Sequence, residues 1–223
     1  MSRKVLLRVS LLALLSTAIQ AQGKDGPGST APLTIYTGFP GGYSADLMGA
    51  LKAQLTAILG PIGLKFQWRD LKTARGNEVV EELVVVSFKG DCSMHGPFLS
   101  HPEIGTLGWT HMSDGVVLPF IDLFCDNVRN LIHSRISERS LAEQERVLGQ
   151  ALGRVMAHEL YHVFGDTARH SSAGVAKGIF TPGDLVSEEF HFRAKEYSML
   201  RNGRLRQLFQ PRTSSLMSSA GAQ

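Results

Sequence analysis

Cysteine is scarce in this sequence, which has only two among its 223 residues, Cys92 and Cys125. They do not form a C-x-x-C pair, and two widely separated cysteines argue against a structural metal site made of thiolates. An isolated pair can form one disulfide bond if the chain is exported to an oxidising compartment. We therefore expect a Cys92–Cys125 disulfide, with two buried free thiols as the alternative.

An apolar run long enough to span a membrane is also absent near the N-terminus. The run there covers residues 9–18, about half of the roughly twenty residues that a spanning helix needs. The positive residues Arg3, Lys4 and Arg8 flank it, and Ala21 offers a cleavage point, with Ala18 as the second choice. These features predict a signal peptide at residues 1–21. We expect a secreted or periplasmic protein that is not stably inserted in the membrane, with an uncleaved anchor over residues 5–19 as the alternative.

An excess of positive charge disappears once the signal peptide is set aside. The full chain has 23 basic and 20 acidic residues, and removing Arg3, Lys4 and Arg8 leaves 20 of each. A nucleic-acid partner is therefore not expected, because binding to phosphates needs a basic surface. The 43% hydrophobic and 19% charged residues are typical of an ordinary globular domain.

The chain divides into one domain with short flanking segments. Residues 22–31 are rich in glycine and are expected to be a disordered leader. Residues 32–211 are expected to form a single domain, and residues 212–223 are expected to be a flexible tail. Strands are predicted at residues 33–37, 64–68, 79–88 and 107–111, with 116–124 as a strand or the lead into a helix. Helices are predicted at 44–59, at 140–165, and from a cap at Thr181 or Asp184 through Leu200. This order favours an α+β fold with a small mixed sheet covered on one face by helices.

The predicted helix at residues 140–165 has the strongest local signals. Ser140 is suited to be its N-cap, and Glu143 completes a capping box. Gly165 is suited to end it. Its apolar residues recur at helical intervals: Leu141, Leu148, Leu152, Val155 and Met156. The residues near Gly165 are therefore expected to have regular α-helical geometry, because the capped helix before them continues to that point.

That end carries the pattern H-E-x-x-H, formed by His158, Glu159 and His162. Four residues on a helix place both imidazoles on one face, one turn apart, where they can bind one metal ion. The carboxylate of Glu159 is adjacent, within reach of water at the metal. This is the pattern of zinc hydrolases when it is helical. We predict a single catalytic Zn²⁺ ion there.

A catalytic zinc ion needs a third protein ligand and an open position for water. His170 is the first candidate, because the chain turns at Gly165 and can bring a nearby side chain back to the metal. A carboxylate of Glu188 or Glu189 on the following helix is the second candidate, and Asp166 is the third. A cysteine thiolate that caps the metal in a latent form is a further alternative.

Residues 158–165 resemble the opening of the metzincin peptidase signature, H-E-x-x-H-x-x-G-x-x-H, with Gly165 at the position of its glycine. The third histidine of that signature would fall at Ala168. Residues 158–177 are more similar to bacterial metzincin-like peptidases, in which H-E-x-x-H is followed after seven residues by H-S and then by G-I-M-R or a similar run. His170-Ser171 and residues 174–177 fit this pattern, with Ala176 where methionine is common.

The resemblance implies a zincin-like fold and a secreted zinc metallopeptidase that hydrolyses a peptide or protein substrate. It implies that zinc activates water, that Glu159 is the general base, and that His158, His162 and His170 are the ligands. By the same resemblance, residues 107–111 are a candidate edge strand for the substrate. Tyr197 and His191 are candidates for stabilising the oxyanion. An exported zinc-binding protein without peptidase activity is the alternative function.

Overall fold

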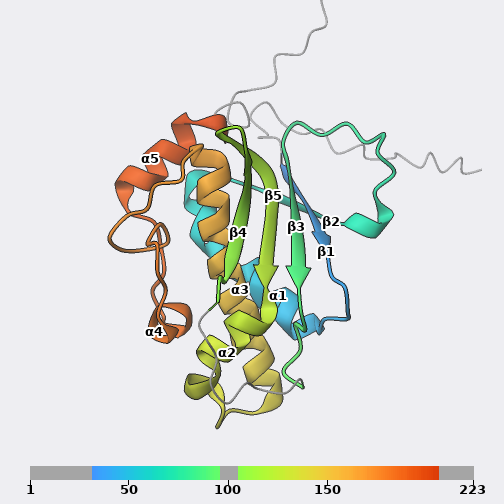
Figure 1. The fold of residues 1–223 in the computed structure, drawn as a ribbon, viewed down its shortest axis with the longest axis vertical. Coiled ribbons are helices and arrows are strands. Elements are labelled where there is room, and N and C mark those ends of the chain that lie inside the picture. The colour runs from blue at the N-terminus through green and yellow to red at the C-terminus, as the bar shows by residue number, and fades with distance from the viewer. Residues whose placement is uncertain (1–31, 96–104, 206–223) are drawn as a thin grey trace, which may run out of the picture.

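A computed structural model describes residues 32–95 and 105–205. The signal peptide predicted at residues 1–21, the leader at 22–31 and the tail at 212–223 lie outside these residues. The described chain forms a sheet with helices packed against it (Figure 1). The predicted α+β class is confirmed, because the described residues contain both a sheet and helices.

The sheet has five strands in the order β2-β1-β3-β5-β4. All neighbours are parallel except β4, which runs antiparallel to β5, so the sheet is mixed as predicted. A two-residue turn at Asp114 and Gly115 joins β4 to β5, and both residues have positive φ, as a tight hairpin requires. The strands are β1 Leu33–Gly38, β2 Phe66–Asp70, β3 Leu83–Lys89, β4 Gly108–Ser113 and β5 Val116–Phe124.

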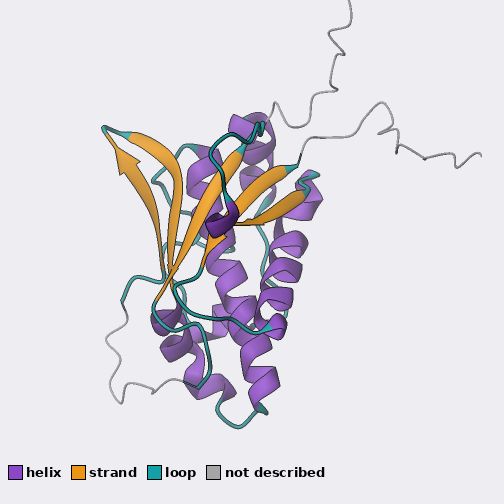
Figure 2. Ribbon diagram, turned by 90° about the vertical axis from the view of Figure 1, so that its right-hand side faces the viewer, coloured by secondary structure: helices purple, strands orange, loops and turns teal. Residues whose placement is uncertain are grey.

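Two long helices, α1 Ala45–Leu59 and α3 Leu141–Gly165, lie side by side and pack against one face of the sheet (Figure 2). Leucines of α1 and alternate residues of the strands form the core between the two layers. Gly149 on α3 lets the helices approach closely, because a Cβ there would lie 2.1 Å from the carbonyl oxygen of Leu47. The long helix predicted from the sequence is therefore the main support of the fold.

The ends of α3 show two confirmed predictions and one correction. The capping box of Ser140 and Glu143 is present. Leu141, predicted on the apolar face, is 43% exposed because the first turn extends past the core. The helix ends at Gly165 as predicted, and its C-cap is Asp166, a left-handed residue with φ of 44°. The side chain of Met199 fills the space beside Gly165.

The sequence prediction was wrong at four other elements. β2 begins at Phe66 and β3 at Leu83, two and four residues later than expected, and helix α2, Cys125–Ile136, was not predicted. The single helix predicted through Leu200 is two short helices, α4 Pro182–Val186 and α5 Ala194–Asn202. The break has a physical cause, since the backbone between them bonds to other elements: Arg154 donates to the carbonyl of Ser187, and Val175 donates to that of His191.

The predicted disulfide is present between Cys92, which follows β3, and Cys125, the first residue of α2. It fixes the start of α2 to the end of a central strand. Arg129 of α2 adds hydrogen bonds to the carbonyl groups of Asp91 and Ser93 on the same segment. Across the described residues, the helices are all too short or too polar to cross a membrane.

Candidate metal centre

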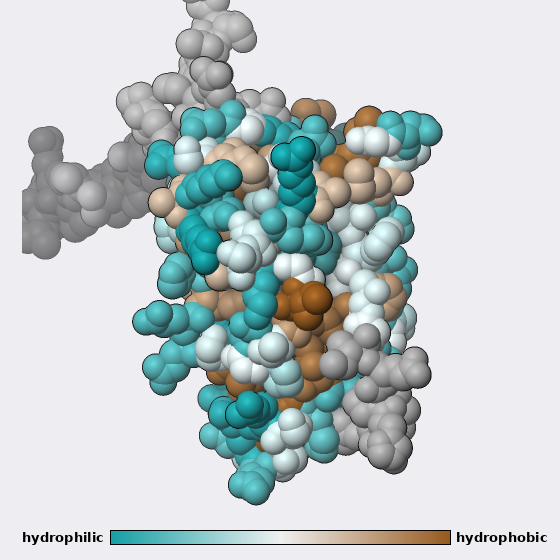
Figure 3. Space-filling view, turned by 60° about the vertical axis from the view of Figure 1, so that its left-hand side comes forward, coloured by the Kyte–Doolittle hydropathy of each residue, from teal (hydrophilic) through white to brown (hydrophobic). Residues whose placement is uncertain are grey.

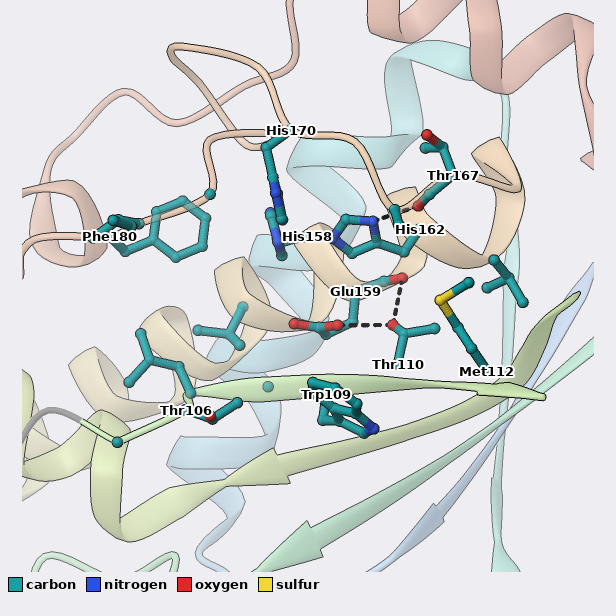
Figure 4. Close-up of a pocket in the computed structure, with 18 residues that line it drawn as sticks. Thr106, Trp109, Thr110, Met112, His158, Glu159, His162, Thr167, His170 and Phe180 are labelled. Atoms are coloured by element: carbon teal, nitrogen blue, oxygen red, sulfur yellow. Dashed lines mark hydrogen bonds between the residues drawn. The ribbon is translucent and has the colours of Figure 1, made fainter. Parts of the chain in front are cut away.

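His158 and His162 lie on the last two turns of α3 and are almost fully buried, with 6% and 9% of their surface exposed. The four-residue spacing places their rings together, as predicted. Their Nε2 atoms are 3.1 Å apart. In Figure 4 both rings point to the same side of the helix, towards the loop that follows it.

His170 comes back from that loop and completes a cluster of three imidazoles. Its ring is stacked on that of His158, with centroids 5.2 Å apart, and lies edge-on to that of His162 at 4.9 Å. One ring nitrogen of each histidine lies within 4.8 Å of the others, a grouping that could hold a metal ion. The alternative carboxylates at Asp166, Glu188 and Glu189 do not belong to this group.

Backbone carbonyl groups determine which nitrogens of the two helical histidines face the cluster. Nδ1 of His158 lies 2.7 Å from the oxygen of Val175, and Nδ1 of His162 lies 2.6 Å from that of Thr167. A carbonyl oxygen only accepts hydrogen bonds, so each Nδ1 carries the proton and each Nε2 of a neutral ring presents a lone pair. Burial lowers the pKa of His158 to about 4 and also lowers that of His162, which keeps both rings neutral.

These residues fit a transition-metal ion. Two lone pairs facing each other at 3.1 Å have no proton between them and repel each other unless a cation lies nearby. Nitrogens bound at 2.0–2.1 Å to a tetrahedral centre would be separated by about 3.3 Å, close to this value. Neutral imidazole suits zinc, copper, iron and nickel. The cluster is therefore a candidate metal centre.

Glu159 lies beside the cluster and is 5% exposed. The hydroxyl of Thr110 on β4 lies 2.7 Å from its Oε2 atom and 3.1 Å from its backbone oxygen, so one proton is shared between the two acceptors. Burial raises the pKa of Glu159 to about 7, against the opposing effect of the Thr110 hydrogen bond. Figure 4 shows this contact between the strand and the helix below the three histidines.

A cavity of about 610 Å³ opens over these groups, between β4 and the segment after α3. His158, Glu159, His162 and His170 contribute to its polar lining, together with three threonines: Thr106, Thr110 and Thr167. Figure 3 shows hydrophobic residues gathered at the middle of one face and surrounded by hydrophilic ones. The apolar side chains of the cavity wall come from three parts of the chain: Leu107, Trp109, Met112, Val117, Val155, Ile179 and Phe180.

Tyr197 and His191, proposed from the sequence for oxyanion stabilisation, do not line this cavity. The hydroxyl of Tyr197 donates to the carbonyl of Ile58 instead. Gly108 and Thr110, which were expected only as part of the candidate substrate strand, lie against Glu159. The alternation of β4 would have placed both on one face of the strand, but the sequence holds no signal that this face meets α3.

Comparisons with known proteins do not assign this centre: no protein-family model matches the chain, and no curated protein is significantly similar to it.

Proposed function

We propose that this chain is an exported zinc metallopeptidase of the zincin type, similar to the metzincins. One observation carries the proposal: three imidazoles and a buried carboxylate meet in one cavity beside the edge strand of a sheet. Three imidazole ligands that leave room for water are the usual composition of a catalytic zinc site, whereas structural sites are closed by a fourth protein ligand.

His158, His162 and His170 would hold the zinc ion through nitrogens that carry no proton. When bound, zinc supplies Lewis acidity, which polarises a carbonyl group and makes water acidic enough to ionise near neutral pH. The Nδ1 hydrogen bonds to Val175 and Thr167 fix the orientation of the two helical rings. Removing a hydrogen bond that supports a metal ligand commonly lowers metal affinity by about 10- to 100-fold.

Glu159 would act as the general base. Thr110 occupies its Oε2 atom, which leaves Oε1 to accept a proton from the attacking water. A carboxyl group whose pKa burial has raised towards neutrality can also return that proton to the leaving amine. The acid and base steps of amide hydrolysis can therefore use this single side chain.

Strand β4 offers a binding surface for an extended peptide. It pairs with β5 on one side, and no described strand pairs with its other edge. Backbone groups at an open edge can hydrogen-bond an added strand, while alternate side chains enter pockets. Residues 107–111, expected from the metzincin resemblance to bind substrate, overlap this strand, and residues 107–110 line the cavity.

The substitution Glu159→Gln tests the proposal. We expect the mature variant to bind zinc as the wild type does, because Glu159 is not a ligand. Hydrolysis of casein or of a peptide library should fall by at least about 100-fold, the contribution typical of general-base catalysis. A wild-type protein that binds one zinc ion yet cleaves nothing in such a library would instead support a zinc-binding protein without peptidase activity.

A further inference from the structure

The loop at residues 170–178 supports the candidate centre in two ways. It carries His170, and the carbonyl of Val175 accepts the hydrogen bond from Nδ1 of His158. A backbone hydrogen bond of 2.7 Å from Ser171 to Ala176 closes the loop on itself. The positions of one ligand and of the contact that orients another therefore depend on how this loop is held.

Glu196 of α5 holds the loop at the residue next to His170. The hydroxyl of Ser171 donates to its Oε1 atom. Glu196 is 5% exposed, and its Oε2 atom has no hydrogen-bond partner within the described part of the chain. A hydrogen bond to a charged carboxylate is about twice as strong as a neutral one, so this contact restrains Ser171 firmly.

The same carboxylate belongs to a helix that also contacts the ligand-bearing helix. Helix α5, which carries Glu196, packs against α3, where the side chain of Met199 fills the space beside Gly165. Glu196 therefore stands on an element that contacts both the loop and α3. Burying a carboxylate with so few partners is costly for a side chain with no further role.

We propose that Glu196 is a positioning residue of the metal centre: through the Ser171 hydroxyl, it keeps the His170 imidazole against His158 and His162. The inference rests on the metal site of the proposed function, but it does not depend on which reaction the site catalyses. Glu196 belongs neither to the histidine cluster nor to the lining of the cavity. It acts by limiting the freedom of the loop that supplies the third ligand.

The test measures zinc affinity by competition with a chromophoric chelator, using the mature protein. Ser171→Ala removes the donor, Ser171→Thr keeps a hydroxyl, and Ser172→Ala is the matched control on the exposed neighbour. We expect Ser171→Ala to weaken zinc binding by about 10- to 100-fold, the range typical of contacts that orient metal ligands. Ser171→Thr and Ser172→Ala should stay within about threefold of the wild type.

A double-mutant cycle with Glu196→Gln separates positioning from general stability. If Ser171 and Glu196 act through one hydrogen bond, the double variant should bind zinc within about threefold of Ser171→Ala alone. The visible absorption of the Co²⁺-loaded protein should change in Ser171→Ala and remain that of the wild type in Ser172→Ala. A merely structural role would lower the melting temperature of the metal-free protein and leave both readouts unchanged.

The inference is overturned if Ser171→Ala binds zinc as tightly as the wild type, whatever its stability. It is also overturned if the wild type itself binds no zinc. If the wild type binds zinc but cleaves no peptide, while Ser171→Ala still binds it more weakly, the inference is supported and the peptidase proposal fails. Metal affinity and hydrolysis are thus tested separately.

Discussion

At the scale of single residues, the space around Glu159 is limited by a residue with no side chain. A Cβ atom on Gly108 would lie 2.6 Å from Oε1 of Glu159 and 2.8 Å from Cγ1 of Val155. Heavy atoms cannot remain at such distances, so either the carboxylate or strand β4 would have to move. Gly108 therefore helps to define where the proposed base stands relative to the metal.

For this reason we expect Gly108→Ala to reduce kcat by about 10- to 100-fold, as small displacements of catalytic groups commonly do. Zinc content should remain that of the wild type, because Gly108 does not contact the histidine cluster. Gly42→Ala is the matched control, since a Cβ at Gly42 meets nothing within 4 Å. Steady-state kinetics with a peptide cleaved by the wild type checks the prediction, and an unchanged kcat in Gly108→Ala would contradict it.

At the scale of elements, the packing of α3 on α1 sets the position of the helix that carries the motif. The close approach at Gly149 involves the backbone of Leu47 on α1. A backbone carbonyl cannot rotate away as a side chain can. The two helices would therefore have to separate to admit any larger residue at this position.

Accordingly, Gly149→Ala should destabilise the fold by about 1–3 kcal/mol, as overpacking of a core typically does. For a domain of this size, that corresponds to a fall in Tm of roughly 2–12 °C. Gly49→Ala, on an open face of α1, should instead raise Tm slightly, because alanine favours the helix. Thermal unfolding followed by circular dichroism distinguishes the two, and a wild-type Tm for Gly149→Ala would refute the packing argument.

The elements predicted best from the sequence are those set by local signals. Ser140 and Glu143 form a capping box whatever lies nearby, and the four-residue spacing of His158 and His162 fixes their relation on the helix. Helix α2 was missed because most of its residues are polar or charged and its N-cap, Phe124, makes no side-chain hydrogen bond. The break between α4 and α5 depends on Arg154, a residue about 30 positions earlier in the chain.

The same distinction applies to the candidate site. His170 could be proposed because a chain that turns at the end of α3 can bring it back within a few residues. The contact of Thr110 with Glu159 joins residues 49 positions apart, on a strand and a helix. No local pattern encodes such a pairing, since it depends on the register of β4 in the sheet and on the packing of that sheet against α3.

At the scale of the whole molecule, the disulfide connects the central strand to α2 and fits the predicted export. Closing a loop of 33 residues restricts the unfolded chain, and by the chain-entropy relation this contributes about 3–4 kcal/mol of stability. We expect Cys92→Ser with Cys125→Ser to lose about this much in chemical denaturation, relative to the oxidised wild type. Wild-type protein with a reducing agent should behave similarly, and equal stability in both redox states would contradict the prediction.

The proposed metal site consists of three histidines, with His170 as the third ligand. Measuring the zinc bound per chain in mature wild type, in His170→Ala and in Glu189→Ala after equal dialysis tests this ligand set. We predict about one zinc ion in the wild type and in Glu189→Ala, as expected of a three-histidine site, and a large loss in His170→Ala. Full retention of zinc by His170→Ala, or its loss in Glu189→Ala, would contradict this account.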